Sequence, residues 1–188
     1  MILQAVEHSL ADGEELQLGA APRIAYRVDS NEAEYSEDAR SLAGPLHAVV
    51  FELVGRPSAD ALLSAKVAPE DREPRLIRCD RVDFPPGAVA YLHTHQGPGI
   101  RVLLRGSIRV ETQGRSHTYG PLEAWFEPGP EPVFAAASDS EPTAFVRCML
   151  LPAALRGKSS IRYVRDEDAA KPKPQQYTVF VDQPVEVP

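Results

Sequence analysis

The stretch YLHTHQGPGIRVLLRG, residues 91–106, decides the fold. Two histidines, His93 and His95, stand one residue apart and are followed by an apolar run. Side chains alternate between the two faces of a β-strand, so a His-x-His pair on a strand points both imidazoles to the same side. The stretch therefore predicts a strand that carries half of a metal site.

The rest of the chain has the rhythm of a β protein. It contains 18 prolines and 12 glycines, which long helices tolerate poorly. Short apolar or alternating runs such as HAVVFELVG, RLIRCDRVDF, SIRVET and AFVRCMLL are separated by turn signals such as PPG, QGPG and EPGPEP. Many short strands at this spacing predict an antiparallel sandwich or closed barrel. Only the segments 32–43 and 57–66 are fair helix candidates, and both are short.

Residues 80–151 resemble the cupin superfamily. Gly87 is followed by five residues, the His93–His95 pair, and a closing glycine at Gly106, as in the first cupin motif. The glutamate of that motif is missing, because its position falls on Gly99 or on the residue after it. The segment 119–134, YGPLEAWFEPGPEPVF, loosely resembles the second motif, and one register places Glu131 where that motif has its histidine.

The resemblance implies an all-β, cupin-type antiparallel jelly-roll β-barrel with N- and C-terminal extensions. We expect an N-terminal arm over residues 1–45, the barrel over 46–151 and a strand-bearing tail over 152–188. The tail would add strands to the barrel or to a neighbouring subunit. Exposed sheet edges and this tail favour a homodimer.

Two interpretations of the missing acid stay open. In one, His93, His95 and Glu131 form a 2-His-1-carboxylate site, which suits Fe(II), with Mn, Ni or Zn as other divalent metals. In the other, the site is lost and the barrel binds an anionic molecule through Arg101, which alternation places on the interior face. The candidate catalytic side chains are Tyr91 and Arg101. The alternative roles are a core aromatic for Tyr91 and, for Arg101, a structural ion pair with an acid such as Glu111 or Glu127.

The predicted function is accordingly a cupin that binds a divalent metal and acts on a small organic molecule, as a dioxygenase-like oxidoreductase or an isomerase. The alternative is a non-catalytic cupin that binds an anionic metabolite without metal.

Charge and composition exclude several other classes. The formal net charge is −7 and no basic block is present, which argues against nucleic-acid and membrane partners. The N-terminus lacks the pattern of a signal peptide, and no apolar run approaches the roughly 20 residues that span a bilayer. We therefore expect a cytoplasmic protein. In that compartment Cys79 and Cys148 are expected to be free, buried thiols rather than a disulfide.

Overall fold

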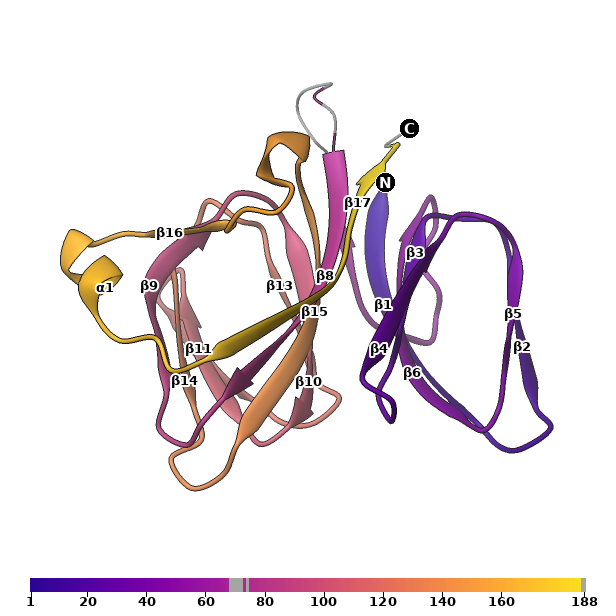
Figure 1. Cartoon of the computed structure of the whole chain (residues 1–188), viewed down its shortest axis with the longest axis horizontal. Coiled ribbons are helices and arrows are strands. Elements are labelled where there is room, and N and C mark those ends of the chain that lie inside the picture. The colour runs from indigo at the N-terminus through magenta and orange to yellow at the C-terminus, as the bar shows by residue number, and fades with distance from the viewer. Residues whose placement is uncertain (68–72, 74, 187–188) are drawn as a thin grey trace.

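The chain is almost entirely β-structure, arranged as a barrel with a further sheet beside it (Figure 1). This description rests on a computed structural model, which describes residues 1–67, 73 and 75–186. Two five-stranded antiparallel sheets form the barrel. The first has the order β13 (Ala124–Glu127), β10 (Gly99–Arg105), β15 (Thr143–Pro152), β8 (Arg75–Phe84) and β17 (Gln176–Val185). The second has the order β12 (Arg115–Tyr119), β11 (Ile108–Thr112), β14 (Val133–Ala137), β9 (Val89–His95) and β16 (Ile161–Tyr163).

The strand order is that of a jelly roll. If the eight strands β8 to β15 are counted in chain order, the first, eighth, third and sixth are neighbours in one sheet, and the second, seventh, fourth and fifth in the other. Two interlocked Greek keys have this arrangement. The predicted fold class, an all-β antiparallel jelly-roll barrel with extensions at both ends, is confirmed.

The N-terminal extension, expected to be a loose or strand-bearing arm, is a sheet. Its order is β4 (Glu32–Ser36), β3 (Arg23–Arg27), β6 (Leu46–Val54), β1 (Ile2–Leu10) and β7 (Ala61–Lys66), and β2 (Glu15–Leu18) pairs with β5 (Arg40–Ala43) beside it. The division expected at residue 46 does not follow the strand pairing, because β6 pairs with β1 and β3 and not with a barrel strand. The first barrel strand described is β8.

Both segments with helical character are strands. The segment 32–43 holds β4 and β5, and 57–66 holds β7, each paired with a neighbouring strand of the N-terminal region. Pairing within a sheet that has a buried face outweighs the modest helix propensity of such short segments. The described helices are η1 (Ala153–Leu155) and α1 (Asp166–Ala170), both in the C-terminal tail.

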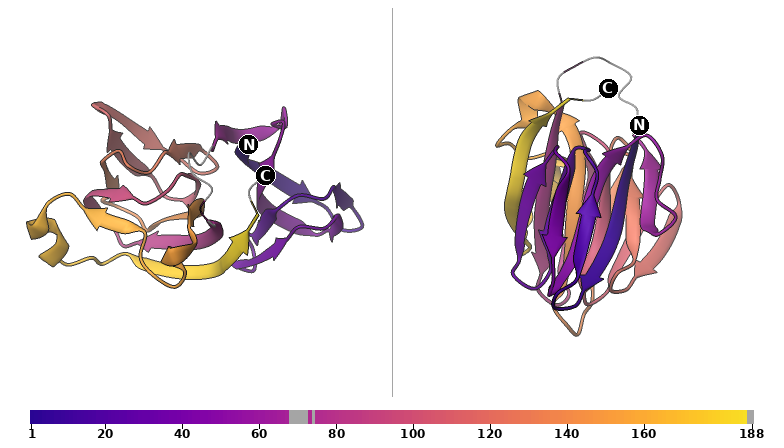
Figure 2. Two further views of the ribbon diagram at one scale, coloured as in Figure 1. Left: turned by 90° about the horizontal axis from the view of Figure 1, so that it is seen from above. Right: turned by 90° about the vertical axis from the view of Figure 1, so that its right-hand side faces the viewer.

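One apolar core joins the N-terminal sheet to the outer face of the first barrel sheet. Figure 2 shows the two bodies side by side, with the C-terminal strand running along the junction. Phe51 of β6 and Ile100 of β10 are fully buried in this core. The rings of Tyr26 and Phe180 lie 5.6 Å apart across it, which ties β3 to β17. The N-terminal sheet therefore covers a barrel face that would otherwise expose apolar side chains to water.

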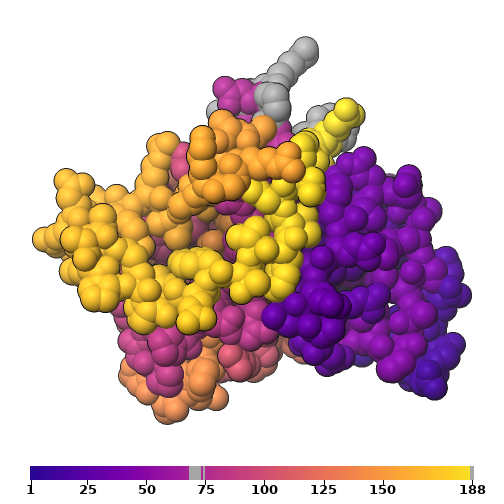
Figure 3. Space-filling view, viewed as in Figure 1, coloured from indigo at the N-terminus to yellow at the C-terminus, as the bar shows by residue number. Residues whose placement is uncertain are grey.

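The C-terminal tail adds strands to the barrel of its own chain. β16 pairs with β9, and β17 pairs with β8 along its whole length. In the space-filling view this segment, orange to yellow, borders a hollow in the barrel face (Figure 3). Among the described residues, no helix combines the length and the apolar character needed to cross a bilayer.

Candidate functional site

The histidine pair lies inside the barrel, as alternation along β9 predicts. His93 and His95 are both about nineteen-twentieths buried, with exposed fractions of 5% and 4%. Their Nε2 atoms are 3.2 Å apart. Nδ1 of His93 lies 2.6 Å from the carbonyl oxygen of Tyr91, and Nδ1 of His95 lies 3.3 Å from Oγ of Ser160. A carbonyl only accepts hydrogen bonds, so His93 is protonated on Nδ1 and presents the lone pair of Nε2 to the cluster.

The carboxylate that faces the pair is Glu127, not Glu131. Oε2 of Glu127 lies 3.4 Å from Nε2 of His95. Glu127 ends β13, where it pairs with Gly99 of β10, so a neighbouring strand brings an acid to the place where this chain lacks the glutamate of the motif. The second oxygen, Oε1, accepts a hydrogen bond of 2.9 Å from the Trp125 indole.

Glu131 lies in a different environment from the one predicted. It is in the loop between β13 and β14 and lines a separate hollow together with Leu92, Glu111 and Phe134. Leu92 stands between Tyr91 and His93 on β9, so its side chain points to the face opposite the histidine pair. The motif register that selects Glu131 counts positions along the chain, whereas strand pairing puts Glu127 opposite Gly99.

Arg101 is buried and forms an ion pair with Glu127. A structural ion pair of this kind was the alternative to a catalytic role for Arg101. Its exposed fraction is 1%, and its Nη2 lies 2.7 Å from Oε2 of Glu127. Nη1 donates to the carbonyl oxygen of Gly99 over 2.7 Å. A side chain at Gly99 would collide with this arrangement, since a Cβ there would lie 2.6 Å from the carbonyl oxygen of Cys148 and 3.2 Å from Nη1 of Arg101. The glycine leaves room for the guanidinium.

A second buried ion pair lies beside the first. Strand register places Arg101, Arg147 and Asp80 next to one another on β10, β15 and β8. Nε and Nη2 of Arg147 donate to the two carboxylate oxygens of Asp80 over 2.6 and 3.1 Å. Such a two-point contact fixes the plane of the guanidinium. The sequence reasoning missed this pair, although alternation along RLIRCDRVDF could have indicated an inward acid.

Burial lowers the pKa of both histidines, which favours their neutral forms. Burial lowers the pKa of His95 well below its usual value, and the nearby guanidinium groups of Arg101 and Arg147 lower it further. Burial also lowers the pKa of His93, although Glu127 opposes that effect. Burial lowers the pKa of Arg101 to about 10, against the opposing charge of Glu127, so Arg101 stays a cation at neutral pH. The cluster thus offers neutral imidazoles beside an ion pair.

The contacts described for Tyr91 do not include Arg101 or Glu127. Its carbonyl holds His93, while its ring has the Nζ of Lys171 at 4.7 Å from the centroid. These contacts are compatible with the core-aromatic role as well as with a catalytic one, and the catalytic role stays a prediction.

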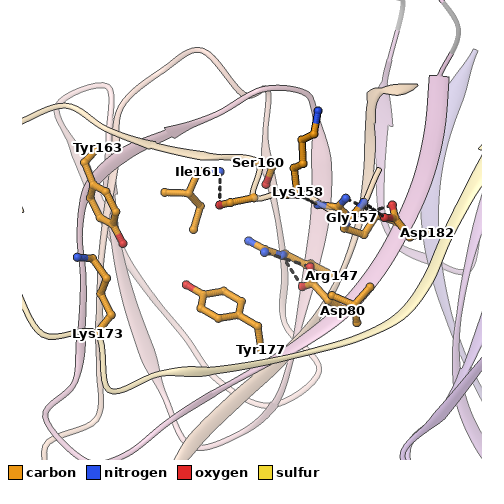
Figure 4. Close-up of a pocket in the computed structure, with 13 residues that line it drawn as sticks. Asp80, Arg147, Gly157, Lys158, Ser160, Ile161, Tyr163, Lys173, Tyr177 and Asp182 are labelled. Atoms are coloured by element: carbon orange, nitrogen blue, oxygen red, sulfur yellow. Dashed lines mark hydrogen bonds and ion pairs between the residues drawn. The ribbon is translucent and has the colours of Figure 1, made fainter. Parts of the chain in front are cut away.

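A cavity of about 540 Å³ opens beside the cluster, between β16 and β17 (Figure 4). Its lining contains the Arg147–Asp80 pair and Ser160, the residue that contacts His95. Tyr163 and Tyr177 project into it from opposite sides. The volume lies within the range of small-molecule sites in proteins.

Comparisons with known proteins find solved structures that are similar to part of this chain. No protein-family model and no curated protein matches the chain. Solved structures similar to part of it include a cupin-like protein from Thermotoga maritima, with 19% identity, 49% of this chain and 69% of that chain covered, and a TM-score of 0.41. A cupin superfamily protein from Desulfitobacterium hafniense is 10% identical over 46% of this chain and 74% of its own, with a TM-score of 0.37.

A DMSP lyase from Ruegeria pomeroyi is 19% identical over 47% of this chain and 43% of its own, with a TM-score of 0.40. Similarity at this level assigns no activity to this chain.

Proposed function

We propose that this chain binds a divalent metal through His93, His95 and Glu127 and acts on a small organic molecule that enters through the adjacent cavity. The observation that carries the proposal is the convergence of three donor atoms, with neighbouring distances of 3.2 and 3.4 Å. Two ligands at about 2.1 Å from one metal are separated by about 3.0 Å at a right angle and about 3.4 Å at the tetrahedral angle.

The outer contacts of the imidazoles support the same assignment. Histidines that bind a metal usually donate their other ring N–H to a carbonyl, a carboxylate or water. Tyr91 O and Ser160 Oγ are in place to accept from the two Nδ1 atoms. Two imidazoles and one carboxylate suit Fe(II) first, and also Mn(II), Ni(II) or Zn(II).

Arg101 is the obstacle to this assignment. No group of three or more His, Cys, Asp or Glu side chains in the described part of the chain is arranged ready to hold a metal ion. The Nη2 of Arg101 already lies 2.7 Å from the oxygen of Glu127 that a metal would use. A metal therefore has to share Glu127 with Arg101, or Arg101 has to withdraw.

The protein groups would contribute orientation and charge to the reaction. A bound metal with open positions would polarise a substrate oxygen or bind dioxygen, which fits isomerase-type or oxygen-dependent chemistry. The fixed Nδ1 contacts hold the two imidazoles at one angle, and the ion pair with Arg101 fixes the position of the Glu127 carboxylate. Burial of the cluster excludes bulk water, which strengthens each of these electrostatic contacts.

The Arg101–Glu127 contact favours a second candidate, in which the barrel binds an anionic metabolite without a metal and the histidines act as hydrogen-bonding groups. One experiment separates the two candidates. Protein purified without a metal-affinity tag is treated with EDTA and titrated with Fe(II), Mn(II), Ni(II) and Zn(II) while thermal unfolding is followed. We expect at least one metal to raise the Tm of the native chain and to leave the His93→Ala, His95→Ala variant unchanged. If no metal raises the Tm, the second candidate replaces the first.

A further inference from the structure

The lining of the cavity beside the cluster is positively charged in an acidic protein. Its basic side chains are Arg78, Arg147, Lys158 and Lys173, against the acidic Asp80 and Asp182, which leaves a net charge of +2. The whole chain has a formal net charge of −7. Cations concentrated at a concave site attract anionic ligands and raise their local concentration.

The two arginines of this lining differ in how many of their N–H donors have a partner in the protein. Arg78 is committed to the protein, because its guanidinium contacts both carboxylate oxygens of Asp182 and the carbonyls of Leu155 and Lys158. Arg147 donates hydrogen bonds only from Nε and Nη2, both to Asp80, and its guanidinium lies over the Tyr177 ring at 5.6 Å from the centroid. No acceptor within the described residues hydrogen-bonds to its Nη1. Arg147 is buried, with an exposed side-chain fraction of 7%, and its guanidinium reaches into the cavity between Ile161 and Tyr177 (Figure 4).

The remaining walls are apolar. Ile161 and Val179 line the cavity together with the rings of Tyr163 and Tyr177. Val179 and Tyr177 are exposed to 54% and 42%, which is unusual for large apolar side chains on a strand that pairs along its length. An apolar wall beside a fixed cation suits a ligand with one anionic group and an apolar body.

We propose that this cavity binds a small organic carboxylate, with the free Nη1 of Arg147 on the carboxylate and the wall formed by Ile161, Tyr163, Tyr177 and Val179 against its apolar body. This inference deepens the proposed function by naming its substrate class, and it replaces Arg101 with Arg147 as the anion-binding arginine. Asp80 is the positioning residue, since its two-point contact turns Nη1 toward the cavity.

The test measures binding of benzoate by titration calorimetry, to protein as purified and after treatment with EDTA. Benzamide has the same aromatic ring without the charge, and acetate has the charge without the ring. We expect benzoate to bind about tenfold or more tighter than either, since a hydrogen bond to a charged group and a buried ring each contribute about that factor. Equal binding of benzoate and benzamide, or of benzoate and acetate, overturns the proposal.

Variants locate the binding. Asp80→Asn with Arg147→Gln removes the charge pair together, so that neither partner is left buried alone, and we expect benzoate affinity to fall at least about tenfold. Val179→Trp fills the cavity from an exposed position and should have a similar effect. Its matched control is Thr178→Trp, which is exposed on the same strand, points to the other face and does not line the cavity. Unchanged affinity in Val179→Trp, or equal losses in the two tryptophan variants, overturns the proposal.

The metal and the carboxylate can fail separately. Benzoate binding that persists after EDTA treatment, in a protein that responds to no metal, supports the cavity and overturns the metal site. A metal response without benzoate binding supports the metal site and overturns the carboxylate-binding cavity.

Discussion

Gly99 makes the sharpest prediction about the arrangement of the site. A methyl group at this position would lie 2.6 Å from the carbonyl oxygen of Cys148 and 2.7 Å from Cγ of Met149. Both residues belong to β15, which pairs with β10 at this point, so the backbone cannot retreat without opening the ladder. The substitution Gly99→Ala is therefore expected to destabilise the fold.

The magnitude follows from two opposing effects. Overpacking of a core costs about 1–3 kcal/mol, and replacing glycine by alanine returns about 0.4–1 kcal/mol through the unfolded state. The net loss is about 1–2 kcal/mol, which lowers the Tm of a chain of this size by about 2–8 °C. Gly55→Ala is the matched control, because no atom lies within 4 Å of a Cβ at Gly55 and its φ is not positive.

Thermal and urea unfolding of the two variants measure the difference. We expect Gly99→Ala to unfold several degrees below the native chain, while Gly55→Ala unfolds at or slightly above it. A Tm for Gly99→Ala equal to that of the control would contradict the close packing of β10 on β15. Gly99→Glu restores the acid of the cupin motif in sequence, and it is expected to destabilise more and to gain no metal affinity, since Arg101 fills the space.

Three further predictions concern other buried groups. Arg101→Met leaves Glu127 buried without its partner and should cost about 3 kcal/mol in EDTA-treated protein, with a smaller loss when metal is added; equal losses in both states would remove Glu127 from the metal site. Burial raises the pKa of the Cys79 and Cys148 thiols, so both should stay unreactive to Ellman's reagent at pH 8 until the chain is unfolded, and rapid labelling of the native protein would show that the core opens. Burial lowers the pKa of His8, so the unfolded state binds the proton more readily and stability should decline as pH falls below about 6.5. His8→Asn should weaken that dependence in unfolding curves at pH 7 and 5, and an unchanged slope would assign it elsewhere.

Much of the barrel could be predicted from the sequence because its signals are local. Alternation along 89–95 places His93 and His95 on one face, and the turns around Gly87 and Gly106 fix the strand ends; both glycines have positive φ, which other residues adopt reluctantly. The N-terminal sheet was harder to predict from the sequence. Segment 46–54 has the pattern of a strand that would fit either the N-terminal sheet or the barrel, and only its pairing with β1, between residues 36 to 52 positions apart, assigns it to the N-terminal sheet.

The contacts of the site residues likewise depend on pairing between strands that are distant in the sequence. Glu127 lies 32 positions after His95, and its place is set by the register of β13 on β10, which no spacing rule along the chain contains. Arg101 was expected to face inward and does, but its partner depends on the same register. Asp80 and Arg147 are 67 residues apart in the chain. The chemistry of these residues was visible in the sequence, whereas their neighbours were not.

The central claim is that Glu127, and not Glu131, completes a metal site with the histidine pair. Elemental analysis of three tag-free proteins, the native chain, Glu127→Gln and Glu131→Gln, tests it most directly after loading with Fe(II) under anaerobic conditions and gel filtration. The account predicts about one metal per chain in the native protein and in Glu131→Gln, and a loss of most of the metal in Glu127→Gln. Metal retained in Glu127→Gln but lost in Glu131→Gln, or absent from the native chain, would contradict it.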